Sequence, residues 1–207
     1  MKKILVWDAP VRVFHWALVA CFMGAWVTGE AEKFRLWHLA FGYTALALVA
    51  FRVLWGIIGT RYARFSSFVS TPREATDHLR ELISGSQKHY LGHTPLGGWM
   101  MLSLMMCILL LVLSGYILYH ELLDWDDLHE GLANLSITLV IFHVIAAIAM
   151  SRLEKENLIK SMWTGYKSTV TDASSVRPQY VIAIALMGTA LYFFLRLVQG
   201  AFPSLTQ

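Results

Sequence analysis

Five apolar segments, each close to the length of a membrane-crossing helix, constrain what this chain can fold into. They are residues 11–28, 36–58, 96–118, 128–150 and 180–198. A helix needs about 20 consecutive apolar residues to cross the hydrocarbon core of a bilayer, and 57% of the chain is apolar. The sequence therefore predicts an all-α membrane protein, with membrane lipid as its main surroundings.

The charged residues between these segments predict how the helices are oriented. Lys and Arg are frequent before residue 13, between 59 and 95 and between 152 and 178, whereas residues 119–127 contain neither and are acidic. Short loops rich in Lys and Arg stay on the cytoplasmic side. We therefore expect a multi-pass membrane protein with a cytoplasmic N-terminus. The start of the chain imitates a signal peptide, but residues 7–10 (Trp-Asp-Ala-Pro) interrupt the pattern and predict that it is retained.

The segment 128–150 carries two histidines at different depths. On an α-helix, His129 and His143 lie about 40° apart around the axis and about 21 Å apart along it. In the predicted orientation, His15 and His143 lie towards the cytoplasmic face, and His38 and His129 towards the outer face. Neutral imidazole is a good ligand for haem iron. We therefore expect His15 and His143 to hold one haem, and His38 and His129 to hold another.

Other residues of the second segment fit a haem protein. Gly42 lies one turn after His38 on the same face of the helix, where it leaves room for a macrocycle. Arg52 lies near the cytoplasmic end, where it can reach the interface or pair with a haem propionate. Each histidine could also be a structural polar residue between helices. Four histidines at matched depths favour ligation, because ionisable groups inside a membrane are costly and usually functional.

The remaining histidines have other interpretations. His93 precedes the third apolar segment and could be a cytoplasmic-side ligand, a proton-handling group at a quinone pocket, or a turn residue. His120 lies at the outer end of that segment and competes as an outer ligand. We interpret His78 and His89, both in the long polar stretch, as surface residues.

That polar stretch also predicts a short amphipathic helix at the membrane surface. Residues 71–74 (Thr-Pro-Arg-Glu) have the chemistry of a helix start, and Gly85 is a plausible end. The apolar side chains of this helix share one face. They are Ala75, Leu79, Leu82 and Ile83.

Composition excludes several other classes of protein. The two cysteines lie inside apolar segments, outside any C-x-x-C or C-x-x-C-H motif, which argues against disulfides, zinc ribbons and covalently attached c-type haem. The sequence contains no basic patch with interleaved aromatic residues, the pattern that would indicate nucleic acid as a partner.

Several segments of the chain form an ordered set of motifs, and the first of them, residues 6–16, reads Val-Trp-Asp-Ala-Pro-Val-Arg-Val-Phe-His-Trp. This segment closely resembles the opening of bacterial cytochrome b561 and of the cytochrome b subunits of nickel-iron hydrogenases. The resemblance extends over about residues 3–167. Its further segments are residues 37–43, 51–56, 90–98, 128–130, 142–144 and 156–158.

The resemblance implies a four-helix transmembrane bundle with two non-covalent b haems, and it gives ligand roles to His15, His38, His129 and His143. We therefore divide the chain into a cytochrome b561-like domain, residues 1–167, and a linker with a fifth transmembrane helix, residues 168–207. Two features depart from the family. Thr94 stands where asparagine is common, and the fifth helix is additional to the four-helix core. That helix could pack against a partner or against a second copy in a homodimer.

We accordingly expect a dihaem membrane cytochrome that transfers electrons between the quinone pool and a redox partner. The acidic residues within 121–127 suit a basic periplasmic partner such as a cytochrome c. Two alternatives stay open. One is a haem-dependent quinol oxidase that acts directly on a small oxidant such as superoxide. The other is a non-redox membrane anchor whose histidines are structural.

Overall fold

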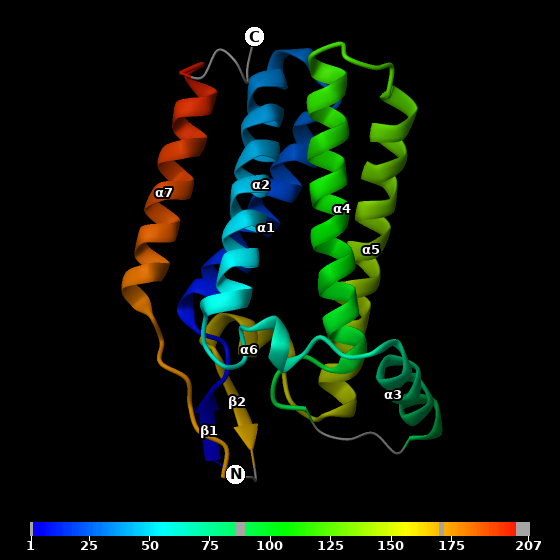
Figure 1. Cartoon of the computed structure of the whole chain (residues 1–207), viewed down its shortest axis with the longest axis vertical. Coiled ribbons are helices and arrows are strands. Elements are labelled where there is room, and N and C mark those ends of the chain that lie inside the picture. Colours follow the sequence, from blue (N-terminus) through cyan, green and yellow to red (C-terminus); the bar gives the residue numbers. More distant parts are fainter. Residues whose placement is uncertain (1, 86–89, 170–171, 202–207) are drawn as a thin grey trace. The chain divides into compact units, whose positions relative to one another are not determined.

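Five long helices correspond to the five apolar segments of the sequence (Figure 1). The structure is a computed structural model that describes residues 2–85, 90–169 and 172–201. Each of the five helices is long and apolar enough to cross a membrane, which confirms the all-α prediction. They are α1 (Ala9–Thr28), α2 (Arg35–Ile58), α4 (Pro95–Tyr119), α5 (Asp126–Leu153) and α7 (Tyr180–Val198).

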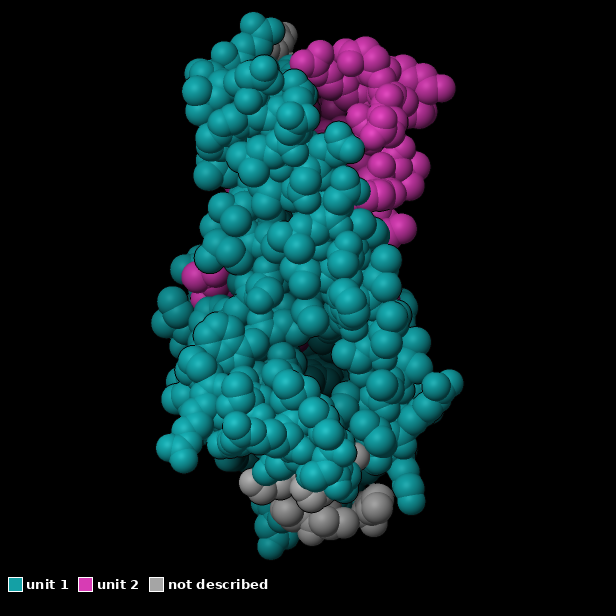
Figure 2. Space-filling model, turned by 90° about the vertical axis from the view of Figure 1, so that its right-hand side faces the viewer, with its two compact units in different colours: residues 1–8, 54–178 teal, residues 9–53, 179–207 magenta. Residues whose placement is uncertain are grey.

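The chain divides into two compact units, which Figure 2 colours separately. Unit 1 contains residues 1–8 and 54–178, and unit 2 contains residues 9–53 and 179–207. Unit 1 therefore holds α4 and α5, and unit 2 holds α1, α2 and α7. The division cuts through α2 near its C-terminal end, between Val53 and Leu54.

Unit 2 is held together by close helix packing and aromatic contacts. α1 packs along α7. The ring of Phe41 on α2 covers Gly24 of α1, where a Cβ atom would lie only 2.4 Å from the ring. Phe41 also lies 4.7 Å, centroid to centroid, from Phe194 of α7, which in turn lies 5.8 Å from Trp37. The fifth helix is therefore packed within its own unit by aromatic side chains.

Unit 1 is built on the antiparallel pair α4 and α5. The short helices α3 (Pro72–Ser84) and α6 (Leu158–Thr164) pack against α4 and α5 respectively. Two strands, β1 (Lys2–Leu5) and β2 (Tyr166–Thr169), pair antiparallel, with Ile4 opposite Lys167. The sequence did not predict these strands, because their pairing joins segments more than 160 residues apart and strand formation depends strongly on the partner.

Two buried charged groups tie distant segments of unit 1 together. Asp8 is 1% exposed, and its carboxylate accepts hydrogen bonds from Trp55 Nε1 (3.0 Å) and Thr60 Oγ1 (2.6 Å). Lys167 lies 3.6 Å from Glu154 and donates to the carbonyl oxygen of Tyr90 at 3.0 Å. Such charges are tolerated in an interior only when they are paired or hydrogen-bonded.

The amphipathic helix α3 forms as predicted but buries a different face. Ala75 and His78 are buried, whereas Leu79 and Ile83 are 47% and 80% exposed. The prediction that His78 is a surface residue is therefore wrong, because α3 turns its Ala75–His78 face into unit 1. Leu79 and Ile83 are left on the outside, which suits a helix at the membrane surface. His89, the other predicted surface histidine, lies outside the described residues.

The predicted capping residues hold the start of α3. Thr71 Oγ1 accepts a hydrogen bond from Glu74 N at 3.3 Å, and the Glu74 carboxylate accepts one from Thr71 N at 2.7 Å. These hydrogen bonds from Thr71, the backbone one first, lower the pKa of Glu74, so its carboxylate keeps capping at a lower pH than an ordinary glutamate. Gly85 ends the helix with a φ of 72°, a left-handed conformation that glycine adopts without strain.

Replacing the cap should therefore loosen α3 and leave the long helices unchanged. We predict that Thr71→Ala destabilises α3 by about 1 kcal/mol, which amide hydrogen exchange in detergent would detect as faster exchange of residues 72–84. Thr71→Ser keeps the hydroxyl and is the matched control. Equal protection of α3 in Thr71→Ala and in the unmodified protein would contradict the prediction.

Candidate haem site

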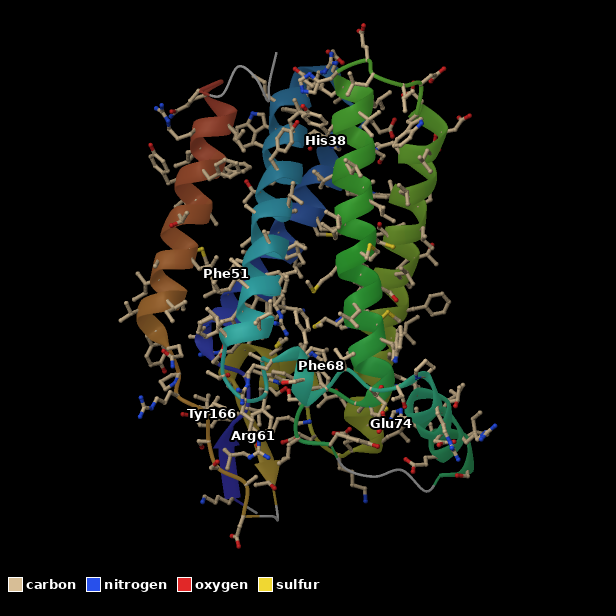
Figure 3. All side chains as sticks on the ribbon, in the orientation of Figure 1. His38, Phe51, Arg61, Phe68, Glu74 and Tyr166 are labelled. Atoms are coloured by element: carbon tan, nitrogen blue, oxygen red, sulfur yellow. The ribbon has the colours of Figure 1, made fainter. Side chains whose placement is uncertain are left out.

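His38 is oriented by a backbone carbonyl of the neighbouring helix. It lies in the first turn of α2 (Figure 3), and its Nδ1 is 2.9 Å from the carbonyl oxygen of Ala25 on α1. A carbonyl oxygen can only accept a hydrogen bond, so Nδ1 must carry the proton. The lone pair of the neutral ring then lies on Nε2, the atom that would bind a metal.

His129 is oriented in the same way by a side chain of α4. Its Nδ1 lies 3.0 Å from Ser114 Oγ, and the Ser114 hydroxyl donates to the carbonyl oxygen of Leu111 at 2.9 Å. Since that hydroxyl has one hydrogen, Ser114 Oγ must accept from Nδ1–H of His129. The lone pair of His129 is therefore also on Nε2.

The residue after Ser114 makes room for the same imidazole. A Cβ atom at Gly115 would lie 2.9 Å from His129 Cε1 and 3.3 Å from its Nδ1. Any larger residue would push the ring away from α4. α4 carries none of the four predicted ligand histidines, yet Ser114 and Gly115 position the ring of one of them, His129. The sequence signal that could have indicated this is a small residue, Gly115, inside an apolar run.

The other two predicted ligands lie on α1 and α5. His15 is half-buried, and its ring lies 4.9 Å from that of Trp16 at 88°. His143 is half-buried on α5, the same continuous helix that carries His129. Between these two histidines lies Ser136, which is 1% exposed and whose Oγ has no hydrogen-bond partner in the described residues. A bound polar group is one way to satisfy such an atom.

Each predicted pair draws one histidine from each compact unit. His15 and His38 belong to unit 2, whereas His129 and His143 belong to unit 1. The pairing of His15 with His143 and of His38 with His129 stays a prediction. The orientation of His38 and His129, by contrast, is set within a single unit in each case.

Gly42 and Arg52 on α2 both fit the predicted haem surroundings. A Cβ atom at Gly42 would meet no other atom within 4 Å, so there is space beside this turn of the helix. Arg52 is 1% exposed, and such burial favours an anionic partner over the predicted alternative of reaching the interface. A haem propionate is an anion of this kind.

His93 and His120 have mainly aromatic neighbours. The ring of His93 lies 4.8 Å from Trp7 and 4.4 Å from Phe68, centroid to centroid, and His93 lines a cavity of about 470 Å³ together with Tyr90. His120 follows the last residue of α4, and its ring lies 4.4 Å from that of Tyr116. The ligand, quinone-pocket and turn interpretations of His93 all stay predictions.

Thr94 takes over a capping role at the start of α4. Its Oγ1 accepts a hydrogen bond from Gly97 N at 3.0 Å. Asparagine and threonine both cap helices in this way. The departure from the family pattern at this position therefore keeps the local hydrogen bond.

Comparison with known proteins decides which family these features represent. A family model described as prokaryotic cytochrome b561 matches residues 6–165. The chain belongs to the prokaryotic cytochrome b561 family. This cytochrome b561 is therefore a multi-pass membrane protein of b-type cytochrome character, which implies bound haem b and electron transfer in the membrane. The matched region includes all four predicted ligand histidines and ends before α7.

Several relatives of this cytochrome b561 are named as cytochrome subunits of Ni/Fe-hydrogenases. A "Probable Ni/Fe-hydrogenase B-type cytochrome subunit" of Rhizobium leguminosarum bv. viciae is 26% identical over 79% of this chain and 88% of its own length. The protein of that name from Cupriavidus necator is 25% identical, over 81% and 88%. The "Probable Ni/Fe-hydrogenase 1 B-type cytochrome subunit" of Escherichia coli K12 is 23% identical, over 79% and 90%. No solved structure matches this chain significantly.

The residues of this cytochrome fit the haem that the family implies. His38 and His129 each direct a basic Nε2 away from a hydrogen-bonded Nδ1, which is the arrangement usual for metal-bound histidine. Haem supplies reversible one-electron chemistry when it is bound. The protein's part is to hold the imidazoles in the right tautomer, to seat the His129 ring against Gly115 and to leave space beside Gly42.

Removing the Ser114 hydroxyl should weaken binding of the haem that we expect His129 to ligate. A hydrogen-bonding partner of a metal ligand is typically worth 10–100-fold in metal affinity. We predict that Ser114→Ala weakens retention of this haem roughly tenfold, measured by haem titration and by the spectrum of the reduced protein. Ser103→Ala changes an exposed serine of the same helix and is the matched control. Unchanged haem affinity in Ser114→Ala would contradict the role of Ser114.

Proposed function

We propose that this cytochrome transfers electrons across the bacterial inner membrane between the quinone pool and a redox partner, through two b haems. One haem would be held by His15 and His143, and the other by His38 and His129. The observation that carries the proposal is the orientation of His38 and His129 through Nδ1. Metal-bound histidine is usually held in this way, with its other ring nitrogen hydrogen-bonded to a neighbouring group.

The geometry of α5 supports a path between the two faces of the membrane. His129 and His143 lie on one helix and are about 21 Å apart along it. Two macrocycles at these depths would cover most of a hydrocarbon core that is about 30 Å thick. Each electron then crosses in short steps between redox groups. In the predicted orientation, the N-terminus is cytoplasmic and His129 belongs to the outer site.

We propose that quinone is exchanged on the cytoplasmic side, near the start of α4. His93 and Tyr90 line a cavity there, and the rings of Trp7 and Phe68 flank His93. Besides aromatic rings, the cavity is lined mainly by serine and acidic side chains, which can hydrogen-bond to the oxygen atoms of a quinone or a hydroquinone. The cavity lies wholly within unit 1.

We propose a nickel-iron hydrogenase as the redox partner, because the relatives are named as cytochrome subunits of such enzymes. A periplasmic cytochrome c is the alternative that the acidic loop supports. Its carboxylates Glu121, Asp124, Asp126 and Asp127 are all exposed. Exposed charges of one sign mainly accelerate the encounter with a partner of opposite charge.

Alanine substitutions of the four histidines test the haem arrangement. We predict that the purified protein binds two b haems. His15→Ala and His143→Ala should lose the same haem, and His38→Ala and His129→Ala the other, because an iron that loses one axial imidazole is held far less tightly. Haem content and low-temperature spectra measure this. His120→Ala should keep both haems. Loss of a whole haem in His120→Ala, with both retained in His129→Ala, would show that the ligands are wrongly assigned.

Neutralising the acidic loop tests the outer partner surface. We predict that Asp124→Asn with Asp127→Asn slows electron exchange with a basic soluble cytochrome c roughly tenfold at low ionic strength, and that added salt removes the difference. Stopped-flow spectroscopy measures the rate. Glu32→Gln changes another exposed acidic residue on the same predicted side and is the control. An equal effect of Glu32→Gln would mean that the loop is not a docking surface.

A further inference from the structure

A polar cavity in unit 1 contains a buried histidine that the haem arrangement does not use. The cavity, about 470 Å³ in volume, lies between α3, residues 66–70 and the residues that precede α4. Figure 3 labels two of its lining residues, Phe68 and Glu74. His78 on α3 lines it as well and is 2% exposed.

The imidazole of His78 lacks ordinary hydrogen-bond partners. Neither Nδ1 nor Nε2 of His78 has one within the described part of the chain. Its ring meets that of Tyr90 edge to face, 5.4 Å between centroids. Buried polar atoms are nearly always satisfied by protein, water or ligand. A side chain of this kind on a cavity wall therefore points to an occupant of the cavity that can donate or accept hydrogen bonds.

Carboxylates surround His78 on several sides. Glu81 on the same helix and Glu154 after α5 both act on its charge. Burial nevertheless lowers the pKa of His78, and the two glutamates oppose this only in part. The imidazole is therefore neutral near pH 7 and able to accept a proton. The other ionisable groups of the cavity are Glu74, Asp77, Tyr90 and His93, and Lys167 lies beyond, paired with Glu154.

The lining narrows the class of ligand. The carboxylates Glu74, Asp77 and Glu81 repel anions such as phosphates. No group of three His, Cys, Asp or Glu side chains in the described residues could hold a metal ion. Three aromatic rings, those of Phe68, Tyr90 and His93, line the cavity, and aromatic rings pack well against a planar molecule. A flat ring with polar oxygen atoms, as in a quinone or hydroquinone head group, fits all three observations.

We propose that this cavity binds the head group of a quinol or quinone and that His78, rather than His93, accepts the proton of the hydroquinone hydroxyl. The inference rests on the proposed exchange of electrons with the quinone pool. Oxidation of one hydroquinone releases two electrons and two protons. Bound haems would supply the acceptors for the two electrons. His78 would take the first proton and Glu81 or Asp77, which also line the cavity, the second, and each group would later release its own proton to water. In quinone reduction, the same side chains would donate protons to the quinone oxygen atoms.

The test uses the purified, haem-loaded protein and a short-chain benzoquinol as the electron donor. His78→Gln keeps the size and polarity of the side chain but cannot take up a proton. We expect haem reduction by the quinol to slow roughly hundredfold at pH 7, with dithionite reduction and haem content unchanged. In the unmodified protein the rate should fall as the pH falls, because protonated His78 cannot accept. That dependence should disappear in His78→Gln.

Thr76→Ala is the matched control, since Thr76 is exposed on the same helix and should leave both the rate and its pH dependence unchanged. The same rate and the same acid-side decline in His78→Gln would overturn the inference and leave the proposed electron transfer intact. Failure of the unmodified protein to accept electrons from any quinol, while dithionite reduces it, would overturn both.

A second measurement decides the matter if His78→Gln does not fold. Diethyl pyrocarbonate modifies neutral imidazoles, and mass spectrometry locates the modified peptide. In the unmodified protein, an excess of a tightly binding quinone analogue should protect His78 from modification by at least several-fold. Equal modification of His78 with and without the analogue would overturn the inference.

Discussion

The hydrogen bonding of imidazole inside an apolar helix pair is the constraint on which the site depends. A neutral histidine has one donor nitrogen and one acceptor nitrogen, and both must be satisfied away from water. In His38 and His129 the donor is matched within the protein, by a backbone carbonyl in one case and by a serine hydroxyl in the other. In the proposed haem sites, Nε2 of each ring would bind the iron. Burying a polar side chain costs desolvation free energy unless the group is hydrogen-bonded. The hydrogen bonds at Nδ1 reduce this cost for His38 and His129.

The same principle explains the arrangement at the other end of unit 1. Asp8, Lys167 and Glu154 are almost fully buried, and each meets partners from a distant part of the sequence. These contacts fix the N-terminal strand against β2 and hold the segment around Tyr90 in place. A cavity with a well-defined wall can form there because the loops that line it are tied down. His78 is the exception, because neither of its ring nitrogens has a hydrogen-bond partner among the described residues.

Much of the fold followed from local pattern. The five apolar segments predicted the long helices to within a few residues, and the residues from Thr71 to Glu74 predicted the start of α3. Hydrophobicity and capping act over a few residues and so can be read from the chain directly. The buried face of α3 could not, because Leu79 and Ile83 are more apolar than His78 yet lie outside. Which face of α3 is buried depended on the rest of unit 1. Apolar residues of a helix at a membrane surface can contact lipid instead of the protein interior.

The sequence by itself determined that this chain crosses a membrane, that His129 and His143 lie at different levels of one apolar helix, and that its motifs match a family of b-type cytochromes. Those properties depend on composition, spacing and order along the chain. Only the tertiary structure decided that Ser114 and the carbonyl of Ala25 set the histidine tautomers, that His78 is buried in a cavity, and that the two ends of unit 1 pair as strands. The reason is physical. Each of these depends on a hydrogen bond or a packing contact between segments that are distant in sequence, and no local pattern records the partner.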